Sequence, residues 1–97
     1  MANNEEVKYL EYKGRPLVRE GDTLCYGNMS DKCILYLMIM SYLPVGDKEV
    51  PDKVLIQILS TDQSLPAHER IIKQGEKNGL ADALDIGTIW LERALNA

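Results

Sequence analysis

The stretch Cys33-Ile34-Leu35-Tyr36-Leu37-Met38-Ile39-Met40 decides the fold of this chain. In a β-strand, successive side chains point to opposite faces of the sheet. One set here is Cys33, Leu35, Leu37 and Ile39, and the other is Ile34, Tyr36, Met38 and Met40. Both sets are apolar, whereas a strand with one solvated face alternates apolar and polar residues. The sequence therefore predicts a strand covered on both faces, which in a chain of only 97 residues indicates a partner.

A long antiparallel hairpin is predicted around this stretch. Its strands cover 32–45 and 48–60, and Gly46-Asp47 forms a two-residue turn between them. Counting back from the turn pairs Ile39 with Val54, Leu37 with Ile56 and Leu35 with Ile58 on one face. The other face pairs Ile34 with Leu59, Tyr36 with Gln57 and Met38 with Leu55. A one-residue slip would mix the two sets, so the pattern predicts this register.

Shorter strands precede the hairpin, and helical periodicity follows it. We expect strands over 7–12, 16–19 and 23–26, a first helix over 64–78 and a second over 80–96. The first helix would have His68, Ile71, Ile72 and Gly75 as its apolar stripe. Gly75 and Gly87 would let the two helices approach closely. The predicted fold class is α+β, an antiparallel β-meander of about five strands followed by two C-terminal α-helices packed on one sheet face.

Length and charge limit the classes of function. We predict a single domain over 1–97, with a disordered polar tail over 1–6. The formal net charge is −4. The densest basic cluster is Arg70, Lys73 and Lys77, and Glu69 and Glu76 interrupt it. Because nucleic-acid binding usually rests on a basic patch, this acidic balance argues against a nucleic-acid partner.

Compartment and redox state follow from what the sequence lacks. The start, Met-Ala-Asn-Asn-Glu-Glu, has no basic segment followed by an apolar one, as a signal peptide would. The apolar runs are too short to span a bilayer, so we expect a cytoplasmic protein with no membrane partner. Free thiols are then the favoured state of Cys25 and Cys33, although a hairpin through Gly27-Asn28 leaves a disulfide open.

Catalytic groupings are weak throughout the chain. His68 is the one histidine, and we interpret it as a histidine at the margin of the core, because it shares the predicted helix face of Ile71. Cys33 lies in the aliphatic row and should behave as a small hydrophobe. Asp82 and Asp85 fit a solvated helix face. Phosphate-binding glycine motifs are absent. We predict no catalytic residues, no cofactor and no metal site.

The second face of the hairpin is the best functional candidate, because Tyr and Met are favoured at interfaces. The predicted interaction residues are Tyr36, Met38, Met40, Tyr42, Leu55 and Leu59, with Ile89 and Trp90 as a smaller group. The function we favour is a non-enzymatic protein-interaction or accessory module that acts as a homodimer. In the alternative, the N-terminal hairpin covers this face through Val7, Tyr9, Leu10, Leu17, Val18 and Leu24.

Two other functions stay open. A small-ligand-binding or enzymatic domain would hold its pocket between sheet and helices, with His68, Tyr36 or Tyr42 as polar contacts. A nucleic-acid-binding regulator is the third and least favoured possibility.

Overall fold

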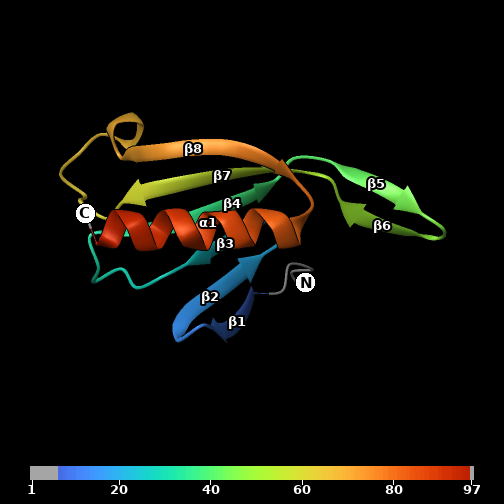
Figure 1. Cartoon of the computed structure of the whole chain (residues 1–97), viewed down its shortest axis with the longest axis horizontal. Helices are drawn as coiled ribbons and strands as arrows, with labels where there is room; N and C mark the ends of the chain where they lie inside the picture. Colours follow the sequence, from blue (N-terminus) through green and yellow to red (C-terminus); the bar gives the residue numbers. More distant parts are fainter. Residues whose placement is uncertain (1–6, 97) are drawn as a thin grey trace, which may run out of the picture.

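The computed structural model describes residues 7–96, so the predicted tail over 1–6 lies outside the described part. Its main feature is a six-stranded antiparallel sheet in the order β1-β2-β3-β4-β7-β8 (Figure 1). The bounds of these strands are β1 Val7–Tyr12, β2 Arg15–Glu20, β3 Thr23–Tyr26, β4 Cys33–Ile39, β7 Lys53–Ser60 and β8 Ile71–Asn78. A separate hairpin of β5 (Tyr42–Val45) and β6 (Lys48–Pro51) projects from this sheet. The remaining elements are the 3₁₀ turn η1 (Ala67–Glu69) and the helix α1 (Leu80–Leu95).

The central hairpin has the predicted register. In the pairing of β4 with β7, Ile39 lies opposite Val54, Leu37 opposite Ile56 and Leu35 opposite Ile58. At the tip Val45 lies opposite Lys48, also as predicted. The two long strands are nevertheless interrupted, so β5 and β6 form a two-stranded arm of their own. Backbone hydrogen bonds from Met40 N to Lys53 O (2.7 Å) and from Asp52 N to Ser41 O (2.8 Å) connect the arm to the main sheet.

The predicted helix over 64–78 is wrong, and with it the two-helix architecture. Residues 71–78 form β8, which pairs with the edge of β7. Two β-branched isoleucines begin this segment and Gly75 interrupts it, and both features disfavour a helix. Pairing with β7 also satisfies backbone groups that would otherwise lie unpaired beside a buried strand. The sequence therefore folds into eight strands and, within residues 7–96, one α-helix.

The chain turns into β8 through a short polar loop. Asp62 Oδ1 accepts hydrogen bonds from the backbone N–H of Ser64 (3.0 Å) and from its hydroxyl (2.7 Å). These bonds lower the pKa of the Asp62 carboxyl. Arg70 Nε donates to the carbonyl of Leu65 at 2.9 Å and fixes the far side of the loop. Ser64 thus stabilises a tight turn instead of starting the predicted helix.

Helix α1 ends one residue short of the predicted 80–96 and covers one face of the sheet. Its buried residues are Ala83, Gly87, Thr88 and Leu91. The two glycines do permit close approach, but of the helix to the sheet. A Cβ on Gly87 would lie 2.8 Å from Leu35 Cδ1, and a Cβ on Gly75 would lie 2.9 Å from Trp90 Cη2. The helix therefore packs directly on β4 and β8.

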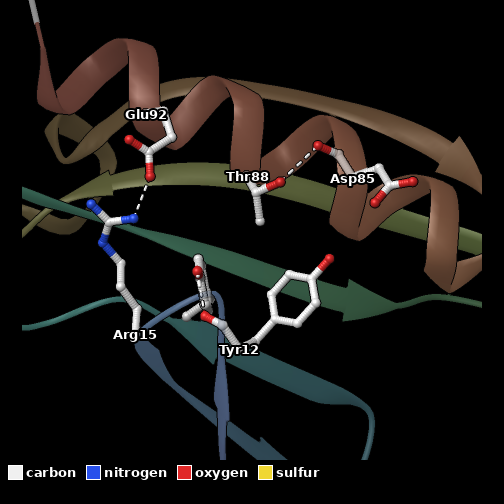
Figure 2. A network of polar contacts seen from close by, with 6 residues as sticks. Tyr12, Arg15, Asp85, Thr88 and Glu92 are labelled. Carbon is white, nitrogen blue, oxygen red and sulfur yellow. Dashed lines mark hydrogen bonds and ion pairs between the residues drawn. The ribbon is translucent and has the colours of Figure 1, made fainter.

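The N-terminal strands extend the sheet rather than folding over it. β2 pairs with β3, and β3 pairs with β4, so the alternative in which this hairpin covers the second face is wrong. Leu17 and Leu24 instead join the core on the helix side. Figure 2 shows how the hairpin is attached there, with Arg15 paired to Glu92 of α1. Tyr26, which is buried, donates its hydroxyl to the carbonyl of Tyr12 at 2.6 Å.

Candidate interaction face

The sheet has two faces of different character. The helix-covered face holds Leu35, Leu37 and Ile56, which are fully buried. The opposite face, here called the open face, has no described element packed on it. Strand alternation assigns eight residues to the open face, of which Ile34 alone is buried: Val18, Cys25, Ile34, Tyr36, Met38, Leu55, Gln57 and Leu59. Met38 is 36% exposed at its centre, and Tyr36 and Leu55 are half-buried.

Polar groups lie toward the β8 side and the strand ends of the open face. Gln57 Nε2 donates to Gln74 Oε1 on β8 at 3.0 Å, so the central amide has a partner within the chain. Glu76 lies beside Leu55, and Glu20 lies beside Thr23 at the other side of the sheet. The apolar centre therefore carries no charged side chain, while charges surround it.

The structure brings together half of the predicted interaction residues. Tyr36, Met38, Leu55 and Leu59 lie on the open face. Met40 follows β4 directly and is exposed. Tyr42 lies instead at the base of the arm, where its hydroxyl donates to Asp22 Oδ1 at 2.5 Å and this bond raises the pKa of the phenol.

The two remaining predicted residues lie on α1, across the sheet from the open face. Ile89 is exposed on the outer side of the helix, and Trp90 packs on Gly75 of β8. The main group and the smaller group, which the sequence already separated, thus lie on two different surfaces. Alternation along the strands assigned the strand residues to a common face, and Ile89 and Trp90 form a separate surface because they belong to the helix on the opposite side of the sheet.

Sequence reasoning missed other apolar residues on the open face and on the arm. Val18 and Cys25 extend the open face onto β2 and β3. The signal that could have found them is two neighbouring apolar residues at 17–18 and again at 24–25. In a strand, one residue of each such pair faces each side of the sheet, and the other residue of each pair is buried here. The arm adds Leu43, Val45 and Val50, all exposed. Leu43 lies opposite Val50, so the arm has an apolar face of its own.

The structure separates the catalytic candidates. His68 lies in η1 with its side chain 80% exposed, so the prediction of a histidine at the core margin is wrong. Its nearest carboxylate oxygen is Glu69 Oε2, at 3.7 Å. Asp82 and Asp85 are exposed, as predicted. Among residues 7–96, no three histidine, cysteine or carboxylate side chains are grouped as metal ligands would be.

Both cysteines are free, which agrees with the favoured prediction. Cys25 lies on the open face, opposite Tyr36, and Cys33 is buried under α1 on the other face. Desolvation raises the pKa of each thiol. A raised pKa lowers the fraction of the reactive thiolate, so neither cysteine has the environment of a nucleophile.

A cleft lies between sheet and helix, as the ligand-binding alternative requires, but its lining differs from the predicted one. The lining residues are Ile58, Ile72, Lys73, Trp90, Arg93 and Ala94. His68, Tyr36 and Tyr42 are not among them.

Comparisons with family models, curated proteins and solved structures found no match to this chain. Within the described range, no helix has both the length and the apolar character that crossing a bilayer requires.

Proposed function

We propose that this chain is a non-enzymatic interaction module that forms a homodimer by packing two open faces against each other. One observation carries the proposal. The apolar second face of β4 and β7 has none of the described elements over it, because β1 to β3 continue the sheet sideways. A strand pair that is apolar on both faces and covered on one exposes surface that a second copy would bury.

The composition of the open face supports this proposal. Interface centres are enriched in aromatic residues and Met and depleted of charge, with a polar rim around them. The open face has Tyr36 and Met38 at its centre and Glu20 and Glu76 toward its sides. Its one central amide, Gln57, already has a hydrogen bond to Gln74, which lowers the penalty of desolvating it.

The size of the face also supports it. Six strands spaced about 4.8 Å apart give a width of about 24 Å, and the longer strands of seven or eight residues are about 25 Å long. The projected area is therefore at most about 600 Å². A standard interface buries about 800 Å² of accessible surface per partner. Since accessible surface exceeds projected area, this upper limit is compatible with a dimer of up to roughly standard size.

The open faces of two copies can pack against each other in an arrangement with two-fold symmetry. Stacked sheets lie about 10 Å apart with their strands within about 30° of each other, so side chains of the two faces interdigitate. A two-fold axis uses the same patch on both copies. The arms would then lie at the margins of the dimer, because each projects from one end of its sheet.

The test is the molar mass in solution as a function of concentration, measured by light scattering or sedimentation. The unsubstituted protein should show a monomer–dimer equilibrium. Met38→Glu places a charge at the centre of the open face and should shift the protein to monomer. Ile89→Glu is the matched control, because Ile89 is 45% exposed but lies on the far side of the sheet.

Three results would overturn the proposal. A monomer at every accessible concentration excludes dimerisation, and a dimer that survives Met38→Glu excludes the open face. A dimer that Ile89→Glu dissociates assigns the interface to the helix. Circular dichroism of both variants shows whether the fold is kept.

A further inference from the structure

A cleft lies between β8 and the last turns of α1, and packing of the hydrophobic core does not account for its shape or its lining. Its volume is about 290 Å³. Apolar side chains of Ile58, Ile72, Trp90 and Ala94 form its walls, and Lys73 and Arg93 are the charged residues that line it. Ile72 is 55% exposed, although it is a large apolar side chain within a strand.

A bulge in β8 places Ile72 there. Ile58 pairs with Lys73 and Leu59 pairs with Ile71, so Ile72 is the extra residue between two regular pairs. Bulges redirect a side chain and are frequent beside binding sites. Strand β8 also places charged residues on opposite faces of the sheet. Lys73 lies on the helix-covered face beside Ile58, and Glu76 lies on the open face beside Leu55. The cleft is therefore lined by Lys73 of β8 but not by the carboxylate of Glu76.

The two cations have no ion-pair partner among residues 7–96. Lys73 Nζ instead lies 4.5 Å from the centroid of the Trp90 ring. Arg93 is exposed at the C-terminal end of α1. In a protein of net charge −4, two cations that line an apolar cleft without a carboxylate are complementary to an anion that has an apolar body.

We infer that this cleft binds small monocarboxylates with an apolar body of about eight carbons. At about 290 Å³ the cleft is at the small end of the range of ligand pockets, which begins at about 300 Å³, so it suits a small ligand. The planar guanidinium of Arg93 suits a carboxylate, and Lys73 adds a second charge. The apolar body would lie along Trp90 and Ile72. This site faces away from the open face, so it does not depend on dimerisation.

Octanoate, below its micelle-forming concentration, is the probe. Trp90 is the one tryptophan of the chain, so its fluorescence reports on the cleft directly. Octanoate should change this fluorescence in a saturable way and shift the amide NMR signals of β8 and the end of α1. Octan-1-ol has a similar apolar body without the charge and should bind at least about tenfold more weakly than octanoate.

Charge variants assign the site. Arg93→Gln should weaken octanoate binding about tenfold, and Lys73→Gln should weaken it several-fold, because each removes a charge-assisted contact. Lys48→Gln on the arm removes a lysine outside the cleft and should leave binding unchanged. Calorimetry provides a second readout, since Lys73→Gln also removes the cation beside the Trp90 ring.

Several outcomes would overturn the inference. These are no heat and no NMR shifts with octanoate, equal binding of octan-1-ol, or shifts confined to the open face. Equal losses in Arg93→Gln and Lys48→Gln would show only a general effect of charge. Thermal melts confirm that each variant is folded, so weaker binding is not a consequence of unfolding.

Discussion

The two faces of β4 and β7 differ in what covers them more than in their side chains. On the helix-covered face, Leu35 and Ile56 are completely buried beneath α1. On the open face, Tyr36 and Met38 belong to the same strand and are about as apolar, yet they remain half-buried or exposed. Apolar character alone therefore does not locate the core of one chain. The difference predicts that the first face supports folding and the second supports association.

The largest expected contrast is between the two cysteines. Cys25 on the open face should react with a thiol reagent in the native monomer, whereas Cys33 should react only when the chain opens. With an ordinary folding stability, Cys33 should label at least about a thousandfold more slowly. Peptide mapping by mass spectrometry assigns each rate, and Cys25→Ser should remove the fast phase. Similar rates for both cysteines would contradict the assignment of faces.

The pH dependence of this labelling is also expected. Desolvation raises both thiol pKa values above the ordinary 9.0, so Cys25 should label slowly at neutral pH and faster as pH rises toward its pKa. The unfolded chain releases its thiol protons at lower pH than the folded chain. Stability contributed by the buried Cys33 thiol is therefore present below pH 9 and lost at higher pH.

Dimerisation should protect Cys25 from the reagent. If two open faces pack together, the labelling rate of Cys25 should fall as protein concentration rises through the dimer range. Met38→Glu should remove this concentration dependence. A rate that is independent of concentration, in a sample that is dimeric, would exclude the open face from the interface.

Next in size are truncations on the two faces. Leu91→Ala under the helix should lower the free energy of unfolding by about 2–5 kcal/mol, because Leu91 is fully buried and leaves a cavity. Met38→Ala should lower it by less than about 1 kcal/mol in the monomer, because Met38 is already exposed. Denaturant unfolding at low protein concentration measures both. Equal losses would show that the open face is part of the folding core.

The close contact of the helix with the sheet predicts a smaller loss. Gly87→Val forces a branched side chain against Leu35 and should destabilise the chain by about 1–3 kcal/mol. Ala81→Val is the matched control on the exposed side of α1 and should have an effect below about 0.7 kcal/mol. Thermal unfolding of the two variants measures the difference. A neutral Gly87→Val would mean that the helix can move away from β4.

The smallest expected effect concerns the ion pair that attaches the N-terminal hairpin to α1. The side chains of Arg15 and Glu92 are 24% and 51% exposed. The hydrogen bond from Arg15 to Glu92 is the main cause of the raised pKa of the guanidinium. Because water screens this pair, a double-mutant cycle of Arg15→Ala and Glu92→Ala should give a coupling below about 1 kcal/mol. A coupling of several kcal/mol would show that the hairpin depends on this pair.

The success at the central hairpin has a local physical cause. Side chains alternate along a strand, and a slip of one residue would exchange Leu37 and Met38 between the faces. A two-residue turn at Gly46-Asp47 then sets the count for every pair, including Leu35 with Ile58. The register could therefore be derived from residues that are near one another in the hairpin.

The failure at 71–78 has the opposite cause. The pattern of Ile71, Ile72 and Gly75 fits one face of a helix about as well as it fits a strand with a bulge. Pairing with the edge of β7, which satisfies the backbone groups of that strand, favoured a strand over a helix for 71–78. Treating this segment as a helix missed the sixth strand of the sheet and the cleft in which Lys73 of β8 lies over the Trp90 ring.

The sequence by itself determined the apolar strand pair, its register and the last helix, because alternation and helical periodicity are properties of neighbouring residues. Only the tertiary structure decided that the N-terminal strands lie beside the sheet, that 71–78 is a strand and that one face has no described cover. These outcomes depend on which distant edges and surfaces meet, and backbone pairing between distant segments leaves no periodic signal in the chain.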